Sequence, residues 1–399
     1  MTRPLEDVKV LDFTQAYSGP YCAMNLADYG ARVIKVERID VGDQSRFWGP
    51  YNKEGYSGYF SIYNRNKESL SIDLRSESGK EIIKKLYAEV DIVVENFKYG
   101  TLDKLGLGYD VAKEINPGII FSSITGFGQT GPLKANTCYD NIAESICGFM
   151  EMTGFPELEP LRSGASVGDS YTGLTMVYAI AVAYYNKLKT GEGKRIDVAM
   201  LDTMFATIDH AVVTYGLKGE ELSRTGNARP NEYVPYDLYE CEDGYFAVAV
   251  TDEDLWKPFC EAIGREDLAE NPDYADNDLR CEHYTELTEA LKESFADKNV
   301  DDLFEKFTEA GLPGVPCLTP MECMENVQIK ARDMIAEIDD KGLGMKYKAF
   351  GIPIKFSETP GEIKKGAPLL GENTADVLKE IGYDEDEINA LVEDHVVGV

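Results

Sequence analysis

The sequence predicts an α/β fold in which a large domain holds a doubly wound parallel sheet and a smaller domain is α+β. Over the first 200 residues, short apolar runs that are typical of strands alternate with helical patterns. From Tyr171 to Tyr185 the chain passes without a charge, over a length too short for a membrane span and suited to a helix buried in a large domain. From Tyr239 to Thr251 the pattern becomes that of a β-hairpin, and acidic amphipathic helices follow it.

The N-terminal elements follow one another at short spacing. Val8 to Phe13 is an apolar run, and the loop from Thr14 to Pro20 leads into a helical pattern that ends near Gly30. Residues 31–37 form the next predicted strand. Later strands are predicted at Ser69 to Leu74, Asp91 to Phe97, Gly118 to Thr125 and Arg195 to Leu201, and later helices at Ser78 to Glu89 and Asp202 to Leu217. Since each parallel pair needs a crossover that covers one sheet face, this alternation predicts helices on both faces.

A polar connector after residue 216, LKGEELSRTGNARPNE, marks a domain boundary. We expect a large domain over residues 1–200, a linker over 201–225, a small α+β domain over 226–325 and a second linker over 326–349. Residues 367–393 return to a helical, charged pattern, and periodicity alone leaves open whether they pack back on the first domain.

The charge distribution limits the classes of molecule that this protein is expected to bind. The 399 residues carry a formal net charge of -31, and residues 231–399 alone hold 41 acidic and 15 basic side chains. Such a polyanion is repelled by nucleic acid and by anionic membrane surfaces, so we expect neither as a partner. An anionic ligand is expected on the near-neutral N-terminal half. The N-terminus lacks the long apolar region of a signal peptide and no apolar run reaches membrane-span length, which favours a cytoplasmic protein.

Several common site types find no support in the sequence. The eight cysteines include no C-x-x-C pair, so neither a metal site nor a disulfide framework is expected. Residues 126–131 read GFGQTG, yet Pro132 and a polar stretch follow where dinucleotide binding needs a helix. With three histidines and no Gly-x-Ser-x-Gly elbow, a Ser-His-Asp hydrolase has no visible base.

Asp169 lies in Gly168-Asp169-Ser170 at the start of the charge-free helix, and two interpretations of it are open. An aspartate there commonly caps free backbone N–H groups, which alone would explain it. The same helix end favours the ionised carboxylate, and an ionised carboxylate can act as a nucleophile.

Seven segments resemble, in order and spacing, the class III CoA-transferases, also called the formyl-CoA transferase or carnitine and bile-acid CoA-transferase family. They are VLDFTQAYSGP, RVIKVERIDVGD, VVENFKYGTLDKLGLGYD, SSITGFGQTGP, GDSYTGL, DGYFAVAV and APLLGENTADVL. The resemblance implies a Rossmann-like large domain completed by about residues 350–399 and a homodimer whose subunits interlock. It implies no permanently bound cofactor, with CoA and acyl-CoA as substrates.

The same resemblance assigns roles to individual residues. Asp169 matches the family's catalytic aspartate, which attacks the donor thioester and passes through a mixed anhydride and an aspartyl-CoA thioester. The residues that match the CoA-binding pattern are Tyr17, Ser18, Arg38, Ile72, Asp73, Leu74, Arg75, Asn96, Phe97, Lys98, Lys104, Thr137, Cys138, Tyr139 and Asp140.

Two departures from the family pattern bear on the substrate. Tyr17 stands where a glutamine is common, and a mobile glycine-rich loop is missing between Thr225 and Tyr239. The nearest resemblance is to bacterial transferases that activate (R)-2-hydroxy acids such as 2-hydroxyisocaproate in amino acid fermentation, which predicts such an acid as acceptor. The alternatives are an acyl-CoA racemase of the same fold, whose histidine is replaced here by Tyr139, and a non-catalytic CoA-binding protein.

Overall fold

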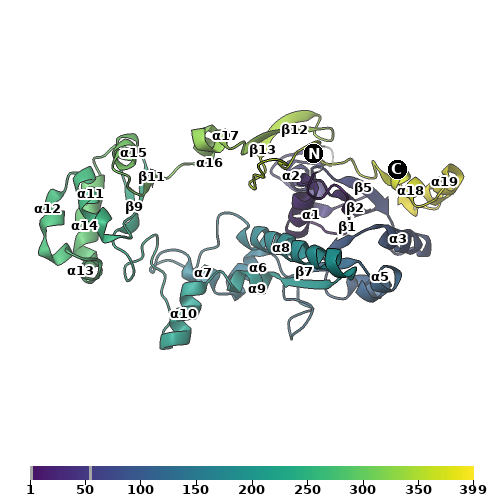
Figure 1. The fold of residues 1–399 in the computed structure, drawn as a ribbon, viewed down its shortest axis with the longest axis horizontal. Helices are drawn as coiled ribbons and strands as arrows, with labels where there is room; N and C mark the ends of the chain where they lie inside the picture. The colour runs from purple at the N-terminus through teal and green to yellow at the C-terminus, as the bar shows by residue number, and fades with distance from the viewer. Residues whose placement is uncertain (1–2, 54–55) are drawn as a thin grey trace. The chain divides into compact units, whose positions relative to one another are not determined.

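The computed structural model describes residues 3–53 and 56–399, and the chain divides into two compact units. Unit 1 contains the chain up to Phe149 together with Ser163–His210 and Gln328–Val399 (Figure 1). Unit 2 contains Met150–Arg162 and Ala211–Val327.

Unit 1 is built on a seven-stranded sheet of order β14-β5-β2-β1-β6-β7-β8. All neighbouring strands are parallel except β14, which runs antiparallel to β5. The strands are β1 Lys9–Asp12, β2 Arg32–Arg38, β5 Glu68–Ile72, β6 Ile92–Glu95, β7 Ile120–Thr125, β8 Arg195–Ala199 and β14 Val397–Gly398. Counted along the chain, the parallel strands stand in the order 3-2-1-4-5-6 of doubly wound folds. The predicted α/β fold with a large parallel sheet is confirmed.

Helices cover both faces of this sheet because alternate residues of each strand point to opposite sides. Val10, Val33 and Val94 pack in one core with helices α1 (Ser18–Asp28) and α8 (Val167–Thr190). Leu11, Ile34 and Val93 pack in a second core on the other face. The helices that join this second core are α3 Glu77–Glu89, α4 Thr101–Lys104, α5 Tyr109–Ile115, α18 Thr374–Glu380 and α19 Glu385–Glu393.

The remaining elements of unit 1 surround the sheet. They are η1 Gln44–Phe47, β3 Asn52–Lys53, β4 Tyr56–Ser57, α2 Gly58–Asn64, α6 Asp140–Ile146, α9 Met200–Phe205, β12 Ile335–Asp340 and β13 Met345–Phe350, while α7 Phe149–Met152, α10 Asp209–Lys218 and α17 Val327–Ala331 span the unit boundaries. Strands β12 and β13 pair as an antiparallel hairpin.

One predicted helix is broken in the structure. The sequence predicts a single helix from Asp202 to Leu217, whereas α9 ends at Phe205 and α10 begins at Asp209. At the break, both the backbone N–H and the hydroxyl of Thr207 donate to the carbonyl of Met204. Threonine makes such local bonds in competition with the helical pattern, so the helix stops there.

Unit 2 has its own core around a three-stranded antiparallel sheet of order β11-β10-β9. The predicted hairpin is confirmed by the pairing of β9 with β10. Phe259, Phe295 and Phe307 are fully buried in this core, and the ring of Phe259 contacts the rings of the other two. The elements of unit 2 are β9 Tyr236–Glu240, β10 Tyr245–Ala249, α11 Glu253–Ile263, α12 Glu266–Glu270, η2 Pro272–Tyr274, α13 Asn277–Glu282, α14 Tyr284–Phe295, α15 Val300–Glu309, β11 Gly314–Pro316 and α16 Pro320–Glu325.

Candidate active site

The carboxyl ends of the parallel strands of unit 1 bring the predicted site residues to one edge of the sheet. The strand order reverses between β1 and β6, and ligands of open α/β sheets bind at this switch point. Tyr17 and Ser18 follow β1, and the segment from Asn96 to Lys98 follows β6. Predicted residues from distant parts of the sequence therefore flank the switch point.

Asp169 lies in the first turn of α8, half-buried beside the start of α1. The backbone N–H of Ser18 forms a hydrogen bond with its carboxylate. The two helices approach closely because Gly173 has no side chain: a Cβ there would lie 2.6 Å from the carbonyl oxygen of Ser18. The first turn of α1 is thus held against the carboxylate of Asp169.

Asp140, and not Asp169, caps helix α8. The backbone N–H of Asp169 donates to Oδ1 of Asp140 at 3.1 Å, and the N–H of Gly168 also bonds to this carboxylate. The expectation that Asp169 caps its own helix is wrong, because the helix amides are taken by Asp140 and the side chain of Asp169 is turned to Ser18. The carboxylate of Asp169 therefore does not serve its own helix and instead meets a first-turn amide of α1.

The pKa of the Asp169 carboxyl is raised to about 7, chiefly by burial and further by the charge of Asp140, while the Ser18 N–H opposes the rise. This corrects the expectation that free amides at the helix start keep the carboxylate ionised, since Asp140 occupies them. A carboxyl that titrates near neutral pH is a stronger nucleophile and base than an ordinary aspartate, and such shifts mark functional sites.

Beside Asp169 lies a group of half-buried tyrosines that sequence reasoning missed, apart from Tyr17. The hydroxyls of Tyr17 and Ser170 lie 2.6 Å apart, and the rings of Tyr17 and Tyr63 are 4.2 Å apart between centroids. Tyr59 contacts both rings, and burial together with the charge of Asp169 raises its pKa. Tyr59 and Tyr63 are four residues apart in the sequence, a spacing that places them on one helix face and could have signalled the pair.

Six buried charged side chains lie next to the loop between β1 and α1. They form three ion pairs, Lys67 with Asp12 at 2.9 Å, Lys35 with Asp43 at 3.0 Å and Arg46 with Glu37 at 2.7 Å. Lys35 also donates to the carbonyl of Thr14 at 2.7 Å, and Asp43 accepts the N–H of Ala16, whose φ is positive. The loop that carries Tyr17 and Ser18 is therefore fixed by buried hydrogen bonds.

Arg38 and the segment from Ile72 to Arg75 lie together at the ends of adjacent strands, with Arg38 and Ile72 as register partners. Arg38 and Arg75 are exposed, which suits contact with phosphate. The side chain of Ile72 is fully buried in the core, so only its backbone is available to a ligand. Asp73 and Leu74 are partly exposed, and Asp73 accepts the N–H of Arg75.

The segment after β6 is anchored on both sides. The amide of Asn96 exchanges hydrogen bonds of 2.8 Å with the backbone N–H and carbonyl of Gln15, so this side chain positions the β1–α1 loop. The buried carboxyl of Glu95 accepts the N–H of Phe97 at 2.8 Å, and burial raises its pKa to about 7. Phe97 packs on the core, while Lys98 and Lys104 are exposed.

The segment from Thr137 to Asp140 leads into α6 and places Asp140 at α8. Thr137 and Tyr139 are exposed, whereas Cys138 is partly buried. A Cβ on Gly126 would lie 2.0 Å from the Cβ of Cys138, so this glycine of GFGQTG allows the two segments to pack closely. Burial and the nearby charges of Asp169 and Asp140 raise the pKa of Cys138 to about 11.

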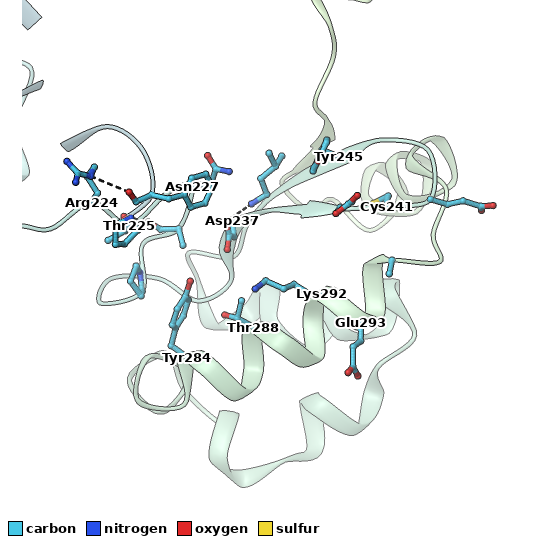
Figure 2. Close-up of a pocket in the computed structure, with 18 residues that line it drawn as sticks. Arg224, Thr225, Asn227, Asp237, Cys241, Tyr245, Tyr284, Thr288, Lys292 and Glu293 are labelled. Atoms are coloured by element: carbon cyan, nitrogen blue, oxygen red, sulfur yellow. Dashed lines mark hydrogen bonds between the residues drawn. The ribbon is translucent and has the colours of Figure 1, made fainter. Parts of the chain in front are cut away.

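A separate cavity of about 1060 Å³ lies in unit 2. Figure 2 shows Asp237 from β9 across from Lys292, which shares one side of α14 with Tyr284 and Thr288. Its lining residues all belong to unit 2 and include none of the predicted CoA-binding residues.

Over residues 3–53 and 56–399, no group of histidine, cysteine and acidic side chains is arranged to hold a metal ion. In the same described part of the chain, none of the helices combines the length and the apolar character that a membrane crossing requires.

Comparisons with known proteins show the family to which this chain belongs. Residues 5–374 match the model of a family described as CoA-transferase family III. A succinyl-CoA–D-citramalate CoA-transferase of Chloroflexus aurantiacus is 33% identical over 99% of this chain and 98% of its own length. A succinyl-CoA:mesaconate CoA-transferase of Haloarcula hispanica is 37% identical over 95% of this chain and 96% of its own. The crystal structure of a CAIB/BAIF family protein from Brucella suis aligns with a TM-score of 0.85 and 36% identity, covering 96% of this chain and all of that one. The chain therefore belongs to the CoA-transferase family III and is a CoA-transferase.

Proposed function

We propose that the enzyme moves CoA from an acyl-CoA donor to a carboxylic acid by covalent catalysis on Asp169. The observation that supports this most directly is the state of the Asp169 carboxyl. It lies half-buried at the start of α8, accepts the Ser18 N–H, and has a pKa raised to about 7. A carboxylate so placed does not cap its own helix and can act as a nucleophile toward a thioester.

The proposed reaction has four steps that balance. An oxygen of Asp169 attacks the thioester carbonyl, the C–S bond breaks, and CoA leaves as the thiolate from a mixed anhydride. The thiolate attacks the aspartyl carbonyl, and the donor acid leaves as a carboxylate from an aspartyl-CoA thioester. The acceptor carboxylate attacks this thioester and forms a second anhydride, whose acyl carbonyl the released thiolate attacks. Acyl-CoA forms and Asp169 is regenerated.

Ser18 supplies donors for the charge that develops in these steps. Its backbone N–H already faces the Asp169 carboxylate. Its hydroxyl is buried and has no hydrogen-bond partner among the described residues, so it is available to an oxyanion. We assign Ser18 to stabilisation of the tetrahedral intermediates on the aspartyl carbonyl.

CoA is proposed to bind along the carboxyl edge of the sheet. The exposed cations Arg38, Arg75, Lys98 and Lys104 are placed to meet its phosphates, and Phe97 to meet its adenine or pantetheine part. The segment from Thr137 to Asp140 and the loop with Tyr17 then border the thioester. CoA acts as a substrate, and the proposed chemistry needs no further cofactor.

A homodimer is proposed because long apolar surfaces of a single chain stand open. Helix α8 exposes a stripe of large apolar side chains along one face, namely Tyr171, Leu174, Tyr178, Val182, Tyr185 and Leu188. Helix α10 buries none of its residues although Val213, Tyr215 and Leu217 are apolar. Exposed patches of this kind mark protein interfaces, and a second copy interlocked with the first would cover them.

For the acceptor we propose a 2-hydroxy acid such as (R)-2-hydroxyisocaproate. The relatives from Chloroflexus and Haloarcula are named for dicarboxylates, of which D-citramalate is also a 2-hydroxy acid. An acceptor panel therefore needs both classes. An acyl-CoA racemase remains the alternative, and its activity would be detected as epimerisation without an added acid.

The test is transfer between purified substrates without ATP. Wild-type enzyme, a CoA thioester and a panel of acids are incubated, and new thioesters are detected by mass spectrometry. Asp169→Ala is expected to fold and to lose transfer, and hydroxylamine with acyl-CoA is expected to leave an aspartyl hydroxamate on Asp169. Full activity of Asp169→Ala would refute the mechanism, and an ATP requirement would indicate a ligase.

A further inference from the structure

A buried carboxylate holds the turn at the carboxyl end of β6. Glu95 is the last residue of this strand and is only 6% exposed. Its Oε2 atom accepts the backbone N–H of Phe97 at 2.8 Å. A side chain that bonds to the backbone N–H two residues further on fixes the conformation of the chain between them. The direction in which Phe97 and Lys98 leave the sheet therefore depends on Glu95.

The residues on either side of Phe97 are bound as well. The amide of Asn96 exchanges hydrogen bonds of 2.8 Å with the backbone of Gln15. The carbonyl of Lys98 accepts the N–H of Thr101 at 3.0 Å and its hydroxyl at 2.7 Å. Three successive residues are thus tied to the β1–α1 loop, to the end of β6 and to the start of α4. The turn is rigid only while the middle bond is present.

The Glu95 carboxyl is buried at a cost in stability. Lys98 and Arg195 line the same cavity of about 20 Å³ as Glu95, but within residues 3–53 and 56–399 neither cation forms an ion pair with it. Burial raises the pKa of this carboxyl to about 7, and the charge of Asp103 adds to the rise while that of Arg195 opposes it. Acidic groups perturbed in this way cluster at functional sites, which favours a role for Glu95 beyond the fold.

We propose that Glu95 is a positioning residue for CoA: its carboxylate holds the N–H of Phe97 and so fixes the turn that presents Phe97 and Lys98 to the CoA molecule. The inference rests on the proposed function, since it takes CoA to bind along the carboxyl edge of the sheet. Glu95 acts through the two residues that follow it. The ammonium of Lys98 can reach a phosphate, and the ring of Phe97 can pack on CoA, only if the backbone aims both side chains at the ligand.

Two substitutions at Glu95 test the proposal. Glu95→Gln keeps a side-chain oxygen that can accept the Phe97 N–H, whereas Glu95→Met keeps the length of the side chain and removes the acceptor. Glu95→Met is expected to raise KM for acyl-CoA, and Kd of free CoA measured by calorimetry, by about tenfold, with kcat within about a factor of two. Glu95→Gln should stay within about twofold of the wild type in all three quantities. Glu95→Ala, which also lacks the acceptor, provides the same comparison if the methionine does not fit the space.

A matched turn at the opposite edge of the sheet provides the control. Oδ1 of Asn116 accepts the N–H of Gly118 at 3.0 Å, again two residues further on, but this bond precedes β7 and lies away from the proposed CoA site. Asn116→Leu is expected to lower the melting temperature and to leave KM and kcat unchanged. Circular dichroism and melting curves establish that each variant folds.

A double variant shows whether Glu95 acts through Lys98. In the wild-type background, Lys98→Ala is expected to raise KM for acyl-CoA severalfold, because a phosphate contact is lost. In the Glu95→Met background the lysine is already misplaced, so the same change should raise KM by less than about twofold.

The outcomes distinguish this inference from the proposed function. If the wild-type enzyme neither binds CoA nor transfers it to any acid of the panel, the proposed function fails and this inference with it. If the wild-type enzyme transfers CoA, three results overturn only the role of Glu95. They are an unchanged KM in Glu95→Met, an equal loss in Glu95→Gln and Glu95→Met, and additive effects of Glu95→Met and Lys98→Ala.

Discussion

The backbone N–H of Asp169 donates to Oδ1 of Asp140 at 3.1 Å, so the residue proposed to react is held in place by a second carboxylate. This arrangement divides two tasks that a single aspartate at a helix start would otherwise combine. Asp140 satisfies the helix amides, and its charge raises the pKa of Asp169. Substitutions at Asp140 can therefore separate the cap from the charge.

Asp140→Asn is expected to extend activity to lower pH. The asparagine keeps an oxygen that can accept the Asp169 N–H but removes a negative charge, so the pKa of Asp169 falls and more of it is ionised under acidic conditions. The ratio of kcat/KM at pH 6 to that at pH 8 should rise about two- to threefold. Asp140→Ala, which also removes the cap, should in addition lower the unfolding free energy by about 0.5–2 kcal/mol. If the acid limb of the pH profile of kcat/KM does not shift in Asp140→Asn, the charge of Asp140 does not raise the pKa of Asp169.

Asp169→Asn is expected to stabilise the protein at alkaline pH. The folded-state pKa of about 7 lies above the ordinary value of 3.8, so the native state holds an extra proton between these limits. The stability that this one carboxyl contributes is therefore greatest at low pH and is lost as the pH rises from 3.8 to about 7. The amide cannot ionise, so the melting temperature of Asp169→Asn should exceed that of wild type by several degrees at pH 8, and the gap should shrink toward pH 5. If the difference in melting temperature between Asp169→Asn and wild type is the same at both pH values, ionisation of Asp169 does not cause it.

Lys67→Met is expected to destabilise the fold strongly. Lys67 is fully buried and pairs with Asp12 at 2.9 Å, and burial lowers its pKa to about 8. Removing the lysine leaves the buried carboxylate of Asp12 without its paired positive charge, which costs about 3–5 kcal/mol of unfolding free energy. Chemical denaturation measures this. Lys346→Met, which breaks the exposed pair with Glu337, serves as control and should leave the unfolding free energy unchanged within error.

Arg38→Ala and Arg75→Ala are expected to weaken binding of the CoA thioester. Both side chains are exposed at the ends of adjacent strands, where a phosphate could meet them. Each change should raise KM for acyl-CoA by about tenfold with kcat within about a factor of two, and the wild-type KM should rise with added salt. Lys84→Ala alters a partly exposed lysine on α3 that pairs with Glu81, and it should leave KM unchanged.

The sheet and the position of Asp169 could be predicted because both depend on local patterns in the sequence. Short apolar runs at regular spacing place most parallel strands within a few residues of where they lie, and a charge-free stretch bounded by Gly168 and Gly191 places α8. The break between α9 and α10 could not be predicted in this way, because it depends on how one threonine hydroxyl bonds to a nearby carbonyl.

The chemistry around Asp169 depends on contacts between segments that are far apart in the sequence. Asp140 and Asp169 are separated by 29 positions, and Tyr17 and Ser170 by 153. No local rule indicates that one aspartate caps the helix of another, or that the buried side chain of Ile72 is withheld from a ligand. Tertiary packing decides both, so these contacts could not be predicted from the local sequence around either residue.

The pairing of β14 with β5 has a consequence for how the protein is made. Val397 lies opposite Ile72, so this contact joins parts of the chain separated by 325 positions. Pairings of such long range form late, because the intervening chain must first be ordered. Until then, the outer edge of β5 presents unpaired backbone groups that another chain could join. We expect newly synthesised molecules to pass through an aggregation-prone folding intermediate. In it, the rest of the sheet has formed but β14 has not yet paired with β5.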